Sequence, residues 1–374
     1  MKEVFVRLKK EIDDSYPILI RAGLLDEAAV LLAERFSHYA FALVSDSNVD
    51  RLYAKPLLDH LRALGCRTAE LISFPAGEES KNREVKARIE DRMCTASLGR
   101  DTVVVAVGGG VAGDLAGFVA ATYARGVRFV QVPTSLLAMV DSSIGGKTGV
   151  NVPWGKNLVG AFCQPSLVII DPRVLATLDP EQLTAGMAEV VKHGVILDAA
   201  LFSFIEENLE KLTALREEVM ADMVARNCQI KAMVVEKDER ESNLRQILNF
   251  GHTVGHALEA LSGYSWLHGQ AVACGMAVEA EIAVRMGLFP KADADRLSQL
   301  LGRLGLPVDL AALKTKAEKV VGLTYLDKKA RGGSPKYVLP RRIGEMARSD
   351  SGAYGIDVQD RVALEALVAC GALN

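Results

Sequence analysis

The chain has 374 residues, of which 49% are hydrophobic and 24% charged, and its formal net charge is -3. This length accommodates two domains with separate cores, and the small net charge gives no electrostatic reason to expect nucleic acid or an anionic membrane as a partner. The start of the chain lacks the apolar run of a secretory signal, and the uncharged glycine-rich stretch Thr102–Gly113 is too short to cross a bilayer. We therefore expect a cytoplasmic protein.

The first half of the chain alternates short apolar runs with helical patterns, which is typical of a parallel α/β sheet. We expect strands at Phe41–Val44, Cys66–Ser73, Thr102–Val107, Phe129–Val132 and Ser166–Ile170. Beyond about Pro180 strand signals nearly vanish, and long helical stretches such as Ala199–Glu236 and Gln270–Met286 dominate. These patterns predict an α/β domain over residues 1–179 and a mostly helical domain over residues 180–374. The six cysteines show no CxxC pair, and we expect them to be reduced core thiols.

A glycine run follows the third expected strand and precedes the helical pattern of Leu115–Tyr123. Glycine after a strand lets backbone N–H groups approach a phosphate, whose charge the next helix N-terminus favours. The run Gly108–Asp114 therefore indicates a dinucleotide site, although its spacing is not GxGxxG and tight turns alone explain many glycine runs. Asp46, just after an earlier strand, is either a ribose acceptor or a solvated turn residue.

The next segment is unusually polar for a loop beside a core. It contains Thr134 and Ser135, then Asp141, and two clusters of glycine with lysine, Gly145–Lys147 and Gly155–Asn157. Glycines beside a lysine let an ammonium and backbone donors converge on an anion. We interpret the segment as a phosphate or carboxylate site, with lysines on a flexible surface turn as the alternative.

Glu189 and Lys192 lie at positions i and i+3 of a helical pattern and therefore share a face. A glutamate among apolar neighbours suits a metal ligand, whereas a plain intrahelical ion pair is the alternative. Basic and amide residues follow at Lys231, Arg245 and Asn249, of which the last two are spaced to face the same way as His252.

Three of the six histidines fall in the short segment from Asn249 to His268. In a helix, His252 and His256 lie one turn apart on one face, and His268 could close on them from the turn-like Trp266–Gly269. Because neutral imidazole is a preferred ligand of zinc and its neighbours, the crowding predicts a metal site completed by Glu189. Capping or core histidines remain the alternative for the HxxxH pair.

At these motifs the chain resembles the 3-dehydroquinate synthase family of sugar-phosphate cyclases. The similar stretches are Gly108–Asn157, Gly186–Gly194, Asn249–Glu259 and His268–Met276, with weaker likeness at Tyr16–Ile20 and Asp327–Gly344. The resemblance implies a Rossmann-like NAD-binding α/β domain, a helical metal-binding domain, an active site in the cleft between them, and a homodimer. It assigns one divalent ion, zinc or cobalt, to Glu189, His252 and His268, so that His256 binds phosphate and assists proton transfer instead.

The resemblance also implies roles for further residues. The ring hydroxyls and the carboxylate of the substrate correspond to Asp141, Lys192, Lys231, Arg245 and Asn249. The phosphate corresponds to Lys147, Asn157, His256 and one lysine of Asp327–Lys329, for which we select Lys328, with Arg125 contributed across a dimer interface. The NAD positions are Asp46, Asn48, Ala76, Gly77, Glu78, Glu79, Ser80, Lys81, Gly110, Val111, Ala112, Gly113, Asp114, Thr134, Ser135, Lys147, Lys156, Val174, Leu175, Ala176 and Thr177.

The implied substrate is the small molecule 3-deoxy-D-arabino-heptulosonate 7-phosphate of the shikimate pathway. NAD would oxidise its C5 hydroxyl, phosphate would leave, the hydride would return, and ring opening with an aldol closure would give 3-dehydroquinate. A cyclase that makes an inosose or a valiolone is an alternative that would alter residues facing the substrate. A metal- and NAD-dependent polyol dehydrogenase is another, but it would not need so many anion-holding lysines, and a non-catalytic metal-binding protein is a third.

Overall fold

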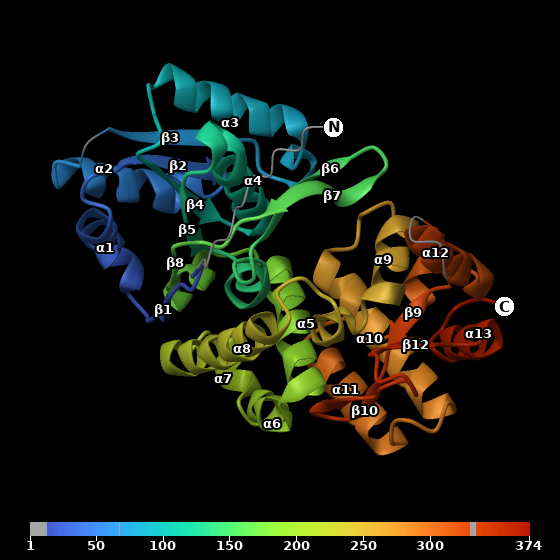
Figure 1. The fold of residues 1–374 in the computed structure, drawn as a ribbon. Helices are drawn as coiled ribbons and strands as arrows, with labels where there is room; N and C mark the ends of the chain where they lie inside the picture. Colours follow the sequence, from blue (N-terminus) through green and yellow to red (C-terminus); the bar gives the residue numbers. More distant parts are fainter. Residues whose placement is uncertain (1–12, 67, 330–333) are drawn as a thin grey trace, which may run out of the picture.

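The N-terminal half is built around a parallel sheet. In the computed structural model, residues 13–66, 68–329 and 334–374 are described, with the side chains of residues 326–329 set aside. The sheet has the order β1-β8-β5-β4-β2-β3 (Figure 1). Its strands are β1 (Ile18–Ile20), β2 (Ala40–Asp46), β3 (Ala69–Phe74), β4 (Thr102–Gly108), β5 (Arg128–Pro133) and β8 (Leu167–Ile170). The five predicted strands are confirmed, whereas β1 is missing from the prediction because three residues carry too short a pattern.

Helices cover both faces of this sheet. On one face, α1 (Ala28–Arg35) and α2 (Lys55–Ala63) pack against Val103 and Val105 of β4. On the other, α3 (Arg83–Thr95) and α4 (Gly110–Thr122) pack against Val104. Since successive side chains of a strand point to opposite faces, burial on both sides requires a continuous apolar run. This requirement explains the sequence Val103–Val107 in β4, every residue of which is buried.

A hairpin made of β6 (Lys147–Val152) and β7 (Gly155–Phe162) extends from this half toward the helical half (Figure 1). The sequence predicts a polar loop here, and that prediction is wrong for most of the segment. A Cβ at Gly160 would lie 2.0 Å from the carbonyl oxygen of Thr148, so the glycine permits close pairing of the two strands. Glycines that resemble loop residues in the sequence therefore belong to strands.

The C-terminal half is mostly helical. Its helices are α5 (Pro180–Leu197), α6 (Ala199–Glu207), α7 (Leu209–Thr213), α8 (Glu217–Lys237), α9 (His252–Leu261), α10 (His268–Arg285), α11 (Lys291–Arg303), α12 (Ala317–Lys329) and α13 (Asp360–Ala369). The predicted continuous stretch Ala199–Glu236 is in fact three helices. The chain leaves helical geometry at Asn208 (φ -112°, ψ 16°) between α6 and α7, and Leu215 adopts a left-handed φ of 51° between α7 and α8. Short strands also occur here: β9 (Lys336–Val338), β10 (Pro340–Arg342), β11 (Glu345–Met346) and β12 (Gly355–Asp357).

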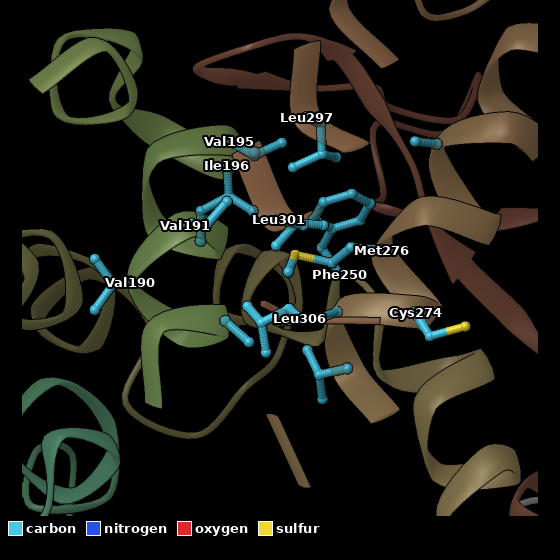
Figure 2. Packing of buried hydrophobic residues seen from close by; sticks show 14 of the residues in the cluster. Val190, Val191, Val195, Ile196, Phe250, Cys274, Met276, Leu297, Leu301 and Leu306 are labelled. Atoms are coloured by element: carbon cyan, nitrogen blue, oxygen red, sulfur yellow. The ribbon is translucent and has the colours of Figure 1, made fainter. Parts of the chain in front are cut away.

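One large apolar cluster lies inside the helical half. Figure 2 shows Val191 of α5, Met276 of α10 and Leu301 of α11 gathered near Phe250, all fully buried. The same cluster continues into Val168 of β8, so the two halves share apolar contacts. A domain boundary at residues 179 and 180 therefore stays a prediction, although α5 does begin at Pro180 with the Asp179 carboxylate accepting hydrogen bonds from its first turn.

The cysteines are free, and the expectation that all occupy the core is wrong. Cys228 and Cys274 are buried, whereas Cys94 is exposed and Cys66, Cys163 and Cys370 are half-buried. No helix in the described part of the chain is long and apolar enough to cross a membrane.

Candidate metal and cofactor site

The N-terminus of α9 carries the first histidines of the site. Gly251 has a left-handed φ of 79°, and a Cβ there would lie 2.5 Å from a side-chain carbon of Met276, so glycine is required. The buried carboxylate of Glu279 in α10 accepts hydrogen bonds from the backbone N–H groups of Gly251 (2.7 Å) and Val254 (3.2 Å). These bonds satisfy donors that the first turn of a helix leaves unpaired, and they fix the position of His252.

His268 reaches the site through close helix packing. It is the first residue of α10, not a residue of the turn before it as the sequence indicated. A Cβ at the next residue, Gly269, would lie 1.8 Å from the backbone oxygen of Ala185 in α5. Only glycine lets the two backbones approach so closely, and this contact sets His268 beside Glu189, one helical turn further along α5.

Glu189, His252 and His268 offer ligand atoms that all lie within 4.8 Å of one another. The Nε2 atoms of His252 and His268 each lie 3.6 Å from Oε1 of Glu189. Two atoms that are each about 2.1 Å from a tetrahedral zinc ion lie about 3.4 Å apart, so these separations fit a shared ion. At 3.6 Å the imidazoles are too distant for good hydrogen bonds, and among the described residues that fully buried carboxylate oxygen has no hydrogen-bond partner.

The electrostatics of the three residues also fit a cation. Burial opposes ionisation of Glu189, but Lys192 and the two imidazoles outweigh burial and hold its pKa well below the usual value. Burial and the charge of Lys192 lower the pKa of His252 to about 3, which keeps its imidazole neutral as a ligand must be. Burial also acts against protonation of His268, yet the nearby carboxylates of Glu189 and Glu259 raise its pKa to about 9. Positive charge is thus stabilised at His268.

The tautomer of His252 is set by its neighbour. Its Nδ1 lies 3.1 Å from the backbone oxygen of Phe250, which can only accept a hydrogen bond, so Nδ1 is the donor. Nε2 then carries the lone pair and faces Glu189. His256 lies one turn along α9 and is exposed, with its ring centre 5.4 Å from that of His252. It belongs to a second possible ligand group with Glu259 and His268, so geometry alone leaves two choices.

Charged residues surround this trio. Lys192 is buried and its ammonium contacts the Glu189 carboxylate, so the predicted i, i+3 pair forms. On α8, Lys231 is buried and its ammonium lies 2.5 Å from Oδ1 of Asp141, in the short helix η5 (Ala138–Ser142). Burial disfavours ionised Asp141, but Lys231 and Lys192 outweigh it and lower the pKa of that carboxyl far below its usual value.

Arg245 and Asn249 lie in the 3-10 helix η7 (Leu244–Asn249), not in one helix with His252 as their spacing indicated. The buried guanidinium of Arg245 donates a hydrogen bond to the backbone oxygen of Gly145 (3.0 Å). The amide of Asn249 donates to Glu241 (2.8 Å), whose carboxylate also contacts the ammonium of Lys147. Lys147 from the hairpin and Asn249 from the helical half therefore meet at Glu241.

The predicted NAD positions gather at one edge of the sheet. Several of them lie at the carboxyl end of a strand. Asp46 ends β2, Thr134 follows β5, and the segments 76–81, 110–114 and 174–177 follow β3, β4 and β8 in that order. The chain reverses its direction of strand addition between β2 and β4, and open α/β sheets bind ligands in the crevice at such a point. The N-terminus of α4, with Gly109 as its N-cap residue, opens onto this crevice.

Several contacts at this edge link the predicted positions. The ammonium of Lys81 contacts the carboxylate of Asp114, and Tyr53 donates or accepts a hydrogen bond with Thr177 (2.6 Å). Asp46 accepts hydrogen bonds from the N–H groups of Asn48 (2.9 Å) and Val49 (3.2 Å), as a turn residue does. Oδ2 of Asp46 also lies 3.5 Å from the position of a Cβ built on Gly108, so Asp46 borders the glycine run.

Comparisons with known proteins identify the family to which the chain belongs. The family model "3-dehydroquinate synthase N-terminal" matches residues 71–185, and "3-dehydroquinate synthase C-terminal" matches residues 186–330. A curated 3-dehydroquinate synthase from Caldanaerobacter subterraneus subsp. tengcongensis is 45% identical over 92% of this chain and 96% of its own length. The chain belongs to the 3-dehydroquinate synthase family of enzymes.

Solved structures of cyclases have the same fold. A 2-epi-5-epi-valiolone synthase from Streptomyces hygroscopicus subsp. jinggangensis, with NAD+ and Zn2+ bound, has a TM-score of 0.87 at 31% identity and covers 98% of this chain and 99% of its own. A 2-deoxy-scyllo-inosose synthase complexed with carbaglucose-6-phosphate, NAD+ and Co2+ has a TM-score of 0.86 at 28% identity, covering 96% and 97%. The Rossmann-like α/β half and the helical half expected for the synthase family are confirmed.

Two predicted phosphate residues, Arg125 and Asn157, do not join the cluster in the structure described here. Arg125 is exposed beyond α4, with a left-handed φ of 70°, and its guanidinium forms no ion pair with another described residue. Asn157 is exposed on β7 with a φ of 57°, and the side chain of Lys328 lies outside the described residues. Conversely, sequence reasoning missed Glu241, Glu259, Glu279 and His193. A glutamate seven residues after His252, at helical spacing to it, is a signal that could have found Glu259.

Proposed function

We propose that this protein converts 3-deoxy-D-arabino-heptulosonate 7-phosphate into 3-dehydroquinate and phosphate. The observation that carries the proposal is the convergence of Glu189, His252 and His268 beside the buried cations Lys192 and Lys231. A divalent-ion site next to several buried cations suits a substrate that carries hydroxyls, a carboxylate and a phosphate. The family relationship supports the same activity.

Glu189, His252 and His268 would hold one zinc or cobalt ion, and the crevice at the carboxyl ends of β2 and β4 would hold NAD. When bound, NAD accepts and returns one hydride, while the metal ion acts as a Lewis acid toward the substrate hydroxyl. Both the zinc-bound and the cobalt-bound cyclase structures have this fold, which supports either ion.

The protein side chains orient the substrate. Lys192, Lys231 and Arg245 are buried donors held by Glu189, Asp141 and Gly145, so they keep their positions without reorganising during the reaction. With Asp141 and Asn249 they would bind the ring hydroxyls and the carboxylate. Because these groups are largely sealed from solvent, they would also exclude water from the reacting carbon.

The phosphate would be held by side chains nearer the surface. We assign it Lys147, Asn157, His256 and Lys328, together with Arg125 of a second subunit in a homodimer. His256 is the exposed imidazole of α9 and would move a proton near the leaving phosphate. Lys147 and His256 are exposed, which would let the phosphate depart after elimination. Residues 1–179 and 180–374 would form the two domains of a cytoplasmic enzyme.

The alternatives have less support. The valiolone and inosose synthases share 31% and 28% identity with this chain, compared with 45% for the curated 3-dehydroquinate synthase. A valiolone or inosose synthase is expected to differ at residues that face the substrate. In this chain those positions, Arg245, Asn249 and His256, match the 3-dehydroquinate synthase pattern. A polyol dehydrogenase would not need the buried Lys192, Lys231 and Arg245, because its substrate carries no carboxylate or phosphate for them to bind.

The deciding experiment is phosphate release from the heptulosonate phosphate with NAD at concentrations far below the substrate. We expect many phosphates released per NAD, no accumulation of NADH, and loss of release when a chelator removes the metal ion. A control reaction with a polyol and stoichiometric NAD should give no steady rise in NADH absorbance. Growth of NADH in step with product would instead support the dehydrogenase and contradict the proposal.

A further inference from the structure

Glu259 lies behind the proposed metal site and binds two partners. It is on α9, with 5% of its surface exposed. One carboxylate oxygen, Oε2, lies 3.5 Å from Nδ1 of His268. The other, Oε1, lies 3.1 Å from the ammonium of Lys156. Neither the sequence patterns nor the family resemblance assigned a role to this glutamate.

The contact with Glu259 defines the tautomer of His268. An ionised carboxylate only accepts hydrogen bonds, so the proton of this contact belongs to Nδ1 of the imidazole. In the neutral imidazole that binds a metal ion, the lone pair then resides on Nε2, the atom that lies 3.6 Å from Oε1 of Glu189. A metal-binding histidine commonly donates its second ring nitrogen to a carboxylate or a carbonyl in this way.

The two histidines of the site are supported differently. His252 donates to the backbone oxygen of Phe250 (3.1 Å), a group that no side-chain substitution removes. His268 instead depends on the side chain of Glu259. Because His268 is the first residue of α10 and its side chain is about one-third exposed, neighbouring side chains do not enclose its ring on every side. Its orientation is therefore the more sensitive of the two to a substitution.

Lys156 fixes the other end of the carboxylate. It comes from the hairpin β6–β7 of the N-terminal half, and its ammonium also lies 4.3 Å from the ring centre of Tyr264. The ammonium is thus held between Glu259 and Tyr264 of the helical half. This ion pair holds Oε1 of Glu259 on the side away from His268, so that Oε2 is the oxygen facing the imidazole.

We propose that Glu259 is a positioning residue that holds the His268 imidazole with Nδ1 protonated and Nε2 directed at the metal ion. The inference rests on the proposed function, since it requires Glu189, His252 and His268 to bind that ion. Glu259 takes no part in the chemistry itself. It preorganises the ligand, so the effect of replacing it is seen first in metal affinity and in the geometry of the bound ion.

The test compares the full-length wild type with Glu259→Gln and Glu259→Asp. Each metal-free protein is titrated with zinc against a chromophoric chelator, and the visible absorption spectrum of the cobalt-loaded protein is recorded. We expect Glu259→Gln to bind zinc about 10- to 100-fold more weakly and to change the cobalt spectrum. Glu259→Asp keeps the charge but draws the carboxylate back from Nδ1, so we expect a smaller loss of affinity.

Glu281→Gln is the matched control, because it removes one charge from an ion pair with Arg285 on α10, away from the trio. It should leave zinc affinity and the cobalt spectrum unchanged. Wild-type affinity and an unchanged spectrum in Glu259→Gln would overturn the inference while leaving the proposed function intact. If the wild type itself bound neither zinc nor cobalt, the proposed function would fail, and these titrations separate the two results. Should Glu259→Gln not fold, Glu259→Asp decides by the same readouts.

Discussion

Nε2 of His252 lies 3.6 Å from Oε1 of Glu189, in a part of the interior where that carboxylate has no solvent exposure. A buried carboxylate without good hydrogen bonds is costly unless a cation compensates it. The ammonium of Lys192 compensates part of the negative charge of Glu189. Nε2 of His268, like that of His252, lies 3.6 Å from Oε1 of the same carboxylate. A cation placed between these three side chains would therefore compensate the buried charge of Glu189.

Replacement of His268 by alanine should remove metal and activity together. The change deletes a third of the protein ligands, so we expect the bound ion to be lost on dialysis against a weak chelator and activity to fall by more than about 100-fold. NAD binding, measured by fluorescence titration, should be retained. His60→Ala, at an exposed position on α2, serves as the control and should keep its metal. Full metal content in His268→Ala would refute the assigned ligand set.

Replacement of Lys231 by methionine should destabilise the protein through Asp141. The variant leaves a carboxylate in a site where Lys231 is its nearest compensating charge, and breaking such a pair costs about 3 kcal/mol of unfolding free energy. The double variant Lys231→Met with Asp141→Asn removes both charges and should recover most of that loss. Urea denaturation measures both changes. A double variant as unstable as the single one would show that the ion pair is not the cause.

Acid should destabilise the metal-free protein partly through His193. Burial and the nearby Lys192 lower the pKa of His193 from 6.5 to about 4, and Lys231 adds to this effect. The carboxylates of Asp141 and Glu189 act in the opposite direction but are outweighed. Between these pH values the unfolded chain binds a proton at this residue that the folded chain does not. Stability is therefore lost as the pH falls from 6.5 toward 4, by about 3 kcal/mol in total, since one pKa unit corresponds to about 1.4 kcal/mol.

The variant His193→Gln isolates this contribution. All other titrating groups are shared with the wild type, so the difference between the two pH profiles of the urea midpoint reports on residue 193 alone. We expect a shallower decline in the variant across this pH window. Parallel profiles would mean that His193 takes up its proton equally in the folded and unfolded chains.

Local patterns predicted the sheet well because its strands are buried on both faces. Val103–Val107 is an unbroken apolar run, and the glycines after it can be recognised as a strand-to-helix turn. The hairpin was missed because Gly149 and Gly160, which look like loop residues, are needed for close strand pairing. Patterns of this kind report on neighbours along the chain and not on which backbones touch.

The same limit explains the histidines. Spacing along α9 favours His252 and His256 as a pair, with His268 as a third candidate from the following turn, and only the family resemblance chose His268 over His256. In the structure His268 reaches Glu189 because Gly269 lets α10 approach the backbone of Ala185, a contact between distant segments that no periodicity encodes. Glu259 was overlooked for a different reason: its helical spacing to His252 was a usable signal, but a glutamate on a helix usually faces solvent.

Arg125 should act on the active site of the other subunit. It lies exposed after α4 in a left-handed conformation, and it forms no ion pair with a carboxylate of the described residues. Its guanidinium is therefore available to a phosphate outside its own subunit. We expect Arg125→Ala to lower activity strongly while NAD affinity changes little. An equal loss of NAD affinity would contradict the phosphate role.

A mixing experiment tests whether the arginine is shared between subunits. Arg125→Ala and His268→Ala should each be nearly inactive alone. In a mixed dimer, however, the site of the Arg125→Ala subunit keeps its own metal ligands and receives Arg125 from its partner, so one site in two is complete. After exchange of subunits we expect activity to return to about a quarter of the wild-type level, because about half of the dimers are mixed. A mixture that stays inactive, although subunit exchange is verified by labelled chains, would place Arg125 in the site of its own subunit or outside any site.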